Sequence, residues 1–244
     1  MEKLENLRKA GRLEDALKEY GALAASASNT ADRAAFMLSQ VSLLCEMGES
    51  ASARKLWNDA KGILPQQSEF SALAKFAESD ILMTEGRYSQ MLDKLDEIER
   101  FHSTLLDSAE YGFLRETIRA RRGIALALLK RPDEALSLLE GAHRVEPTDG
   151  TICFYLSSCY FNQALYAKAR DMLIEAFQHG IPTHLQYRAH FALGLTYYHL
   201  RSLARALEQF ELCLKAPQSI REELDLNAWL AATRKYLGLD PPPD

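Results

Sequence analysis

Small and apolar residues recur along the chain at helical spacing, and the same pattern returns at similar intervals. Its anchor position is occupied in turn by Ala16, Ala53, Met91, Ala135, Ala169 and Ala206, so successive intervals are 37, 38, 44, 34 and 37 residues. Four residues after these anchors come Tyr20, Trp57, Leu95, Leu139, Leu173 and Phe210. Because residues four apart share one face of a helix, each interval predicts an amphipathic helix that begins near its anchor.

A second stripe precedes each anchor and predicts a partner helix. Nine residues before the anchors lie Leu7, Leu44, Leu82, Leu126, Tyr160 and Tyr197. Five residues before, where a turn between the two helices falls, three of the six positions are Gly11, Gly48 and Gly86. Prolines that would stop the second helix stand at Pro65, Pro147, Pro182 and Pro217. The pattern therefore predicts helical hairpins at about 1–29, 30–65, 68–106, 108–147, 150–182 and 184–217.

The last hairpin, Tyr187 to Pro217, reads YRAHFALGLTYYHLRSLARALEQFELCLKAP. Leu193-Gly194 followed by Tyr197, and then Ala206 and Phe210 beyond the turn, resemble the signature of a tetratricopeptide repeat (TPR). The resemblance implies an all-α fold, a right-handed α-α superhelical solenoid of about six hairpins over residues 1–217. Stacking is expected because one hairpin cannot bury both of its apolar faces alone.

Beyond Pro217 the sequence predicts one more helix, at 218–239. An apolar face is formed by Leu226, Trp229, Leu230, Thr233 and Leu237. Ser219 and Glu222 have the spacing of a capping box that would begin this helix. We expect the helix to cover the exposed face of the last hairpin. Residues 240–244 (Asp-Pro-Pro-Pro-Asp) are expected to be a disordered tail.

The third and fourth hairpins depart from the repeat pattern. Lys75 and Glu78, and then Arg119 and Arg122, stand where apolar residues are expected. The connecting segment EIERFHSTLLDSAEYGF is about ten residues longer than the standard. One interpretation is that the helices on either side of it are extended and protrude from the stack. The other is a different register for the fourth hairpin, with a stripe of Leu114, Ile118, Ala125 and Leu129.

Composition narrows the function classes. Net charge is −5, which gives no basic surface for nucleic acid. No run of about 18 apolar residues predicts a membrane span, and the charged start MEKLENLRKAGRLEDALKEY lacks the apolar core of a signal peptide. The scattered cysteines fall at core positions and are typical of reduced thiols in a cytoplasmic protein: Cys45, Cys153, Cys159 and Cys213.

Motifs for catalysis, cofactors or metals are missing from the pattern. There is no phosphate-binding glycine loop and no Cys-x-x-Cys pair, and His179 and His184 flank a turn where solvated side chains are expected. An acidic run is formed by Asp93, Asp96, Glu97 and Glu99, and a basic stripe by Arg115, Arg119 and Arg122. Each is either a binding patch or a set of surface ion pairs. We predict no enzyme, no cofactor and no metal site.

The resemblance implies that the first helix of each hairpin lines a concave groove. The predicted groove residues are Phe76, Met83, Phe154, Ser158, Phe161, Asn162, Arg188, Phe191, Leu195, Tyr198 and His199. We predict a non-enzymatic scaffold that binds a protein or peptide there, with the C-terminal aromatic residues as anchors. Alternatively these residues pack under the terminal helix. A self-associating homo-oligomer and an enzyme or small-molecule binder with an unrecognised site are the other hypotheses.

Overall fold

The computed structural model describes residues 2–9, 11–65, 68–108 and 112–239. This part of the chain contains fifteen α-helices, one short 3-10 helix and no β-strand. The all-α fold and its succession of helical hairpins are therefore confirmed. The predicted tail at 240–244 lies outside the described residues. Contacts divide the chain into two compact units, Met1–Lys130 (unit 1) and Arg131–Asp244 (unit 2).

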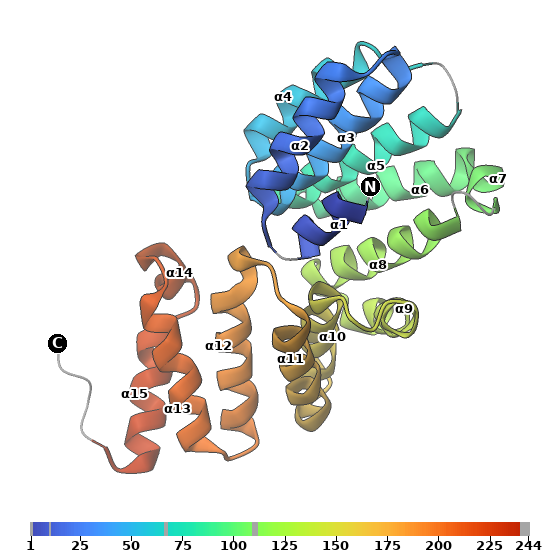
Figure 1. Cartoon of the computed structure of the whole chain (residues 1–244). Coiled ribbons are helices and arrows are strands. Elements are labelled where there is room, and N and C mark those ends of the chain that lie inside the picture. Colours follow the sequence, from blue (N-terminus) through green and yellow to red (C-terminus); the bar gives the residue numbers. More distant parts are fainter. Residues whose placement is uncertain (1, 10, 66–67, 109–111, 240–244) are drawn as a thin grey trace. The chain divides into compact units, whose positions relative to one another are not determined.

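Unit 1 consists of α1 (Glu2–Lys9), α2 (Leu13–Ser26), α3 (Thr30–Glu46), α4 (Ser50–Lys61), α5 (Ser68–Thr84), α6 (Tyr88–Phe101), α7 (Ser103–Leu106) and α8 (Gly112–Leu128) (Figure 1). The first helices of the second and third hairpins lie side by side, since α3 packs against α5, and α3 also packs against α2, the second helix of the first hairpin. Antiparallel partners α3 and α4, and α5 and α6, close the hairpins, and α8 packs against α6.

Unit 2 consists of α9 (Pro132–Val145), α10 (Gly150–Asn162), α11 (Tyr166–His179), α12 (Thr183–His199), α13 (Leu203–Leu212), η1 (Cys213–Lys215), α14 (Gln218–Glu223) and α15 (Leu226–Leu237) (Figure 1). Two hairpins, α10 with α11 and α12 with α13, pack in series, and α9 contacts α10. The order of packing follows the order of the sequence, as stacked repeats require. The prediction of one continuous domain over residues 1–217 stays a prediction.

The anchor positions explain why these hairpins form. Ala16, Ala53, Met91, Ala135, Ala169 and Ala206 are all 0% exposed. A small side chain at this position lets two helices approach closely, and the large apolar residue four positions on fills the space beside it. Phe210 and Leu95 show this, since both are completely buried. Burying such a side chain contributes roughly 1.5–3 kcal/mol, which is a large share of a domain's net stability.

The turns inside the hairpins share one backbone conformation. Gly11, Gly48 and Gly86 have positive φ, as the predicted turns require. The α10–α11 and α12–α13 hairpins, which lack glycine there, use the same left-handed conformation at Ala164 (φ 58°) and Arg201 (φ 60°). Lys130, the last residue of unit 1, has it as well (φ 59°). The conformation strains a residue that carries a Cβ, by roughly 1–2 kcal/mol. The turn geometry is thus set by the hairpin and not by the presence of glycine.

Replacing Ala164 by Gly is expected to stabilise unit 2. Relief of the left-handed strain outweighs the entropy that glycine adds to the unfolded chain, so the free energy of unfolding should rise by about 0.5–1 kcal/mol. Urea unfolding followed by circular dichroism measures the change. As a matched control, Ala231→Gly in the exposed interior of α15 should lower stability by about 1 kcal/mol. A loss of stability in both variants would contradict the strain at Ala164.

The structure decides between the two interpretations of the middle hairpins. Helix α6 has 14 residues and α8 has 17, the same lengths as α2 and α3. Part of the extra sequence forms the separate short helix α7. The competing stripe is the buried one, because Leu114, Ile118 and Ala125 are in the core. The prediction of protruding, extended helices is therefore wrong.

The C-terminal region differs from the predicted single helix. A residue in left-handed conformation, Asp225, separates α14 from α15. The capping box is wrong, since Ser219 lies inside α14 and Glu222 instead accepts a hydrogen bond from Gln218 at 2.6 Å. The apolar face exists nevertheless. Leu226, Leu230 and Thr233 are buried, and α15 packs on α13, so the last hairpin is covered as expected.

All four cysteines are buried free thiols, as their core positions predicted. Burial raises the pKa of the Cys45 and Cys213 thiols to about 12 and that of Cys153 and Cys159 to about 11. They therefore remain protonated at neutral pH and pack as small apolar side chains. Among the described helices, none has both the length and the apolar character needed to cross a lipid bilayer.

Candidate functional site

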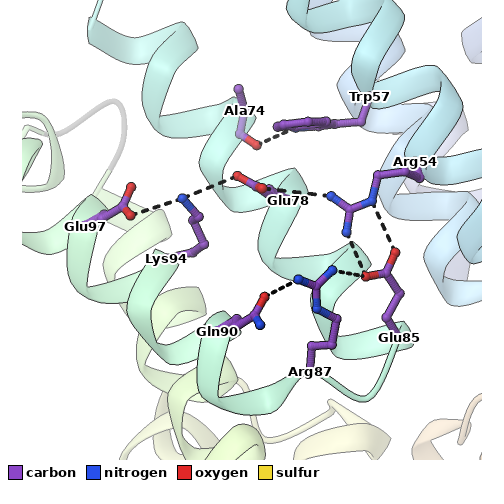
Figure 2. Close-up of polar contacts among 9 residues, drawn as sticks. All are labelled: Arg54, Trp57, Ala74, Glu78, Glu85, Arg87, Gln90, Lys94 and Glu97. Atoms are coloured by element: carbon purple, nitrogen blue, oxygen red, sulfur yellow. Dashed lines mark hydrogen bonds and ion pairs between the residues drawn. The ribbon is translucent and has the colours of Figure 1, made fainter.

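The polar residues that broke the repeat pattern in the third hairpin form ion pairs between helices (Figure 2). Arg54 on α4 binds Glu85 in a two-pronged contact, at 3.2 and 2.8 Å, and lies 3.9 Å from Glu78. Lys94 on α6 lies between Glu78 and Glu97 at 3.7 and 3.1 Å. This network joins α4, α5 and α6, so it replaces part of the apolar contact that the repeat pattern leads one to expect.

The arginine stripe of α8 is also paired. Arg122 contacts Glu99 at 2.6 Å and Asp96 at 2.5 Å, both on α6, and Arg119 contacts Glu116 on its own helix at 2.8 Å. Of the two interpretations left open by the sequence, surface ion pairs account for this patch and for most of the acidic run. Exposed pairs of this kind contribute little stability each.

Arg121, next to this stripe, takes part in a buried pair. Its Nη1 lies 2.6 Å from Oδ1 of Asp80, a residue of α5 that is 2% exposed. Ser42 donates a hydrogen bond to the other carboxylate oxygen at 2.8 Å, and the guanidinium lies over the ring of Phe76 at 4.6 Å. The contact is a close ion pair rather than a well-aligned hydrogen bond. It ties α3, α5 and α8 together at the positions predicted to line the groove of unit 1.

The predicted groove residues fall into two classes by their distance from the anchor. Phe154 and Phe191, fifteen residues before their anchors, are only 7% and 9% exposed and belong to the core of unit 2. The expectation that they line an open surface is corrected accordingly, because both rings are packed into the core of unit 2. Phe161 and Tyr198, eight residues before their anchors, are half-buried at the last turn of α10 and α12.

Phe161 and Tyr198 belong to a continuous set of aromatic rings, which we term the ring cluster. It consists of Phe161 (α10), Tyr166 (α11), Tyr198 and His199 (α12), and Trp229 and Tyr236 (α15). The rings come from the ends of two consecutive hairpins and from the terminal helix. Sequence positions 37 residues apart, Phe161 and Tyr198, are thus brought into one surface by the stacking of repeats.

His199 joins the two halves of the ring cluster. It stacks on Tyr166 with centroids 4.6 Å apart and planes 13° from parallel, and it meets the edge of Phe161 at 5.4 Å. On its other side Tyr198 lies at 6.0 Å, and Tyr198 in turn contacts Trp229 at 5.3 Å. Tyr236 completes the row 6.0 Å from Tyr198 and is 63% exposed. Tyr198 therefore packs against the terminal helix, as the alternative prediction stated. The same helix also adds the rings of Trp229 and Tyr236 to the aromatic surface.

Polar residues predicted as groove anchors have partners within the chain. Arg188 binds Glu223 of α14 at 2.6 Å, and the Asn162 amide donates to the Ser158 carbonyl at 2.8 Å. Leu195 packs against the core of unit 2 and is half-buried. In unit 1, Met83 and Phe76 are likewise half-buried against the core. Arg188 thus fixes α14 on α12.

Sequence reasoning missed Tyr166 and Tyr236 as surface residues. Tyr236 follows Trp229 by seven residues on a helix, a spacing that could have placed both on one face. It also did not group three side chains of unit 2 that have the donor atoms for a metal ion: His143, Cys153 and Glu175 each offer one such atom within 4.8 Å of the others. No spacing motif connects them, because they belong to α9, α10 and α11.

Comparison with solved structures finds several similar folds. A tetratricopeptide repeat protein from Parabacteroides merdae matches with a TM-score of 0.53 and 18% identity, covering 90% of this chain and 79% of that chain. A thermophilic TPR protein of Thermus thermophilus matches with a TM-score of 0.51 and 20% identity, over 82% and 98% of the two chains. A chain of the APC/C hetero-tetramer Cut9–Hcn1 matches with a TM-score of 0.62 and 15% identity, over 97% of this chain and 49% of that one. No protein-family model matches the sequence, and a comparison with curated proteins returns no match.

Proposed function

We propose that this chain, which has the fold of tetratricopeptide-repeat proteins, is an interaction scaffold that binds a segment of another protein on the ring cluster of unit 2. One observation carries the proposal: six aromatic rings from four helices form one row, with His199 and Tyr236 exposed to solvent. Tyrosine and tryptophan are the residues that most often dominate binding energy at protein interfaces. Tyr236 is 63% exposed, so packing of the core does not explain its place in the ring cluster.

The chemistry of the rings indicates the kind of segment. Stacked and edge-on rings present apolar faces at the turn ends of two hairpins, which suits aliphatic or aromatic side chains of an extended or helical segment. Burial and the neighbouring Tyr236 raise the pKa of Tyr198, so its phenol stays neutral, while the charge of Arg201 acts in the opposite direction. An acidic residue beside the apolar anchor of the segment would complement Arg201.

Buried thiols and paired charges support a scaffold rather than an enzyme. The cysteine pKa values of about 11 to 12 leave no thiolate nucleophile at neutral pH. The described arginines of α8 and the carboxylates around them are engaged with one another. Binding, and not chemistry, is therefore the function that the surface of unit 2 supports best.

Removing the two exposed rings, by His199→Ser with Tyr236→Ser, is expected to lower the affinity for the partner segment at least tenfold, roughly the loss seen at interface hot spots. Partners captured from native lysate by the wild-type chain are compared quantitatively with those captured by the variant. The segment common to them is then titrated against both proteins. The fold should survive, because both side chains lie at the surface.

Phe101→Ser serves as the matched control. Phe101 is an aromatic residue of unit 1 that is 62% exposed, close to the value for Tyr236, and it does not belong to the ring cluster. Its replacement should leave the affinity unchanged. If the two variants lose binding equally, or neither loses any, the ring cluster is not the docking surface.

A further inference from the structure

Three side chains of unit 2 with different donor atoms lie close together between helices. The Nδ1 of His143, on α9, lies 3.7 Å from the Sγ of Cys153, on α10. The Nε2 of the same imidazole lies 3.6 Å from Oε2 of Glu175, on α11. Taking one donor atom from each residue, all three lie within 4.8 Å of one another. Sulfur, nitrogen and oxygen donors in one place are the combination used by zinc sites.

The separations suit a bound ion. Zinc binds sulfur at about 2.3 Å and nitrogen or oxygen at about 2.0–2.2 Å, so tetrahedral geometry places two donors roughly 3.4–3.6 Å apart. The sulfur–imidazole distance is already within about 0.2 Å of that range. Glu175 lies next to the other ring nitrogen, Nε2, so its carboxylate must turn toward the Nδ1 side for all three residues to bind one ion. Its side chain is long and 37% exposed, which permits this movement. The donor set excludes calcium and magnesium as the preferred ions, because these take oxygen ligands.

The backbone holds two of the donors in place. Gly150, in the first turn of α10, lies so close to the end of α11 that a Cβ there would be 2.5 Å from the Gly180 carbonyl oxygen and 2.8 Å from that of Ala176. This close approach sets Cys153, three residues on, beside Glu175, one residue before Ala176. Asp149 is already used as the cap of α10, accepting from the amides of Thr151 and Ile152 at 2.7 and 3.1 Å.

A cysteine next to a histidine can be a catalytic nucleophile or a metal ligand, and the solvent exposure of the two side chains separates these roles. Cys153 is 0% exposed, so an organic substrate could not reach its sulfur, which argues against a nucleophile. His143 and Glu175 are partly exposed, at 21% and 37% of their side chains, and they give a small ion an entry path. A site with three protein ligands leaves a fourth position for water.

We propose that His143, Cys153 and Glu175 form a zinc-binding site that ties α9, α10 and α11 together. Zinc would replace the thiol proton of Cys153, which is released to solvent, so binding should tighten as pH rises. The bound ion would cross-link the first three helices of unit 2 and stabilise them against unfolding. The site is independent of the ring cluster, because it shares none of its residues.

The test uses the full chain, freed of affinity tags and stripped of metal with a chelator. Zinc is titrated against a chromophoric chelator, and cobalt is titrated separately to look for the charge-transfer absorption that reports a thiolate ligand. We expect one zinc ion per chain, the thiolate–cobalt band, and a rise in the unfolding midpoint with zinc. Since loss of even an outer partner weakens metal sites by about 10–100-fold, Glu175→Gln should weaken zinc binding at least tenfold. Cys153→Ala should abolish the cobalt band.

Cys159→Ala is the matched control, because Cys159 is a buried thiol of the same helix with a similarly raised pKa and no place in the site. This variant should keep both zinc affinity and the cobalt band. If Cys153→Ala fails to fold, Glu175→Gln still tests the proposal. The side chain of Glu175 is partly exposed, so this variant should fold. A wild-type chain that binds no zinc, or variants that bind it as tightly as the wild type, would overturn the proposal.

Discussion

Arg121→Ala is expected to destabilise unit 1 by about 3–5 kcal/mol at neutral pH, because it leaves the carboxylate of Asp80 buried without its counter-charge. Asp80 is 2% exposed, and the hydrogen bond from Ser42 and the more distant charge of Arg8 would remain to compensate its charge. The chain has two tryptophans, one in each unit, so in a Trp229→Phe background the fluorescence of Trp57 reports the unfolding of unit 1 alone. Urea unfolding followed by this signal measures the change.

The same variant has a pH dependence with a definite sign. Burial raises the pKa of Asp80, whereas Arg121 and Ser42 lower it. Without Arg121 the folded-state pKa rises further above the unfolded value. A group whose pKa is higher in the folded than in the unfolded state makes its full contribution to stability below its unfolded-state pKa. That contribution is lost as the pH rises through its folded-state pKa. The destabilisation by Arg121→Ala should therefore be smallest in acid and grow as pH increases.

Two controls separate the buried charge from lost packing. Asp80→Asn combined with Arg121→Ala removes both charges and keeps a partner for Ser42, so it should recover more than half of the lost stability and most of the pH dependence. Arg119→Ala removes a half-exposed arginine from the same helix and should cost less than about 0.5 kcal/mol. Equal effects of all three variants at every pH would count against the ion pair.

Much of the fold could be predicted because its determinants are local. A small anchor and an apolar residue four positions later, as with Ala206 and Phe210, specify a close helix contact by spacing alone. The turn positions show where local reasoning ends. Ala164 and Arg201 adopt the left-handed turn without any sequence signal, because packing of α10 on α11 and of α12 on α13 imposes it.

The candidate sites could be predicted only in part, because they depend on contacts between distant residues. Phe154 and Phe161 are both aromatic residues on one helix, seven positions apart, yet the first is buried and the second lies at the open end. Nothing in the local pattern distinguishes them. Similarly, Asp80 and Arg121 are 41 residues apart, and their pairing depends on how α5 and α8 are placed. Residue type therefore identifies candidate site residues, but only their packing shows which of them are buried and which are exposed.

Phe210→Ala is expected to destabilise unit 2 by about 3–5 kcal/mol, the usual cost of emptying a buried aromatic site. Phe210 is 0% exposed and contacts three groups at once: Phe191 with ring centroids 5.6 Å apart, Trp229 at 6.2 Å, and the backbone of Gly194. Its loss therefore weakens both the last hairpin and the attachment of α15. Trp229 fluorescence in a Trp57→Phe background measures the unfolding of unit 2, and its emission should shift because the neighbouring ring is gone.

Gly194→Ala tests the same contact from α12. We expect it to destabilise unit 2 when Phe210 is present and to stabilise unit 2 when Phe210 is replaced by alanine. A Cβ at residue 194 would lie 2.5 Å from Cε1 of Phe210, whose ring is enclosed by Phe191 and Trp229, so the substitution alone should cost about 1–3 kcal/mol. In the Phe210→Ala background the obstruction is gone, and alanine is the better helix former by about 1 kcal/mol. The methyl group also fills part of the cavity, so there Gly194→Ala should stabilise unit 2. Additive effects of the two substitutions would show that α12 and α13 are not held together by this contact.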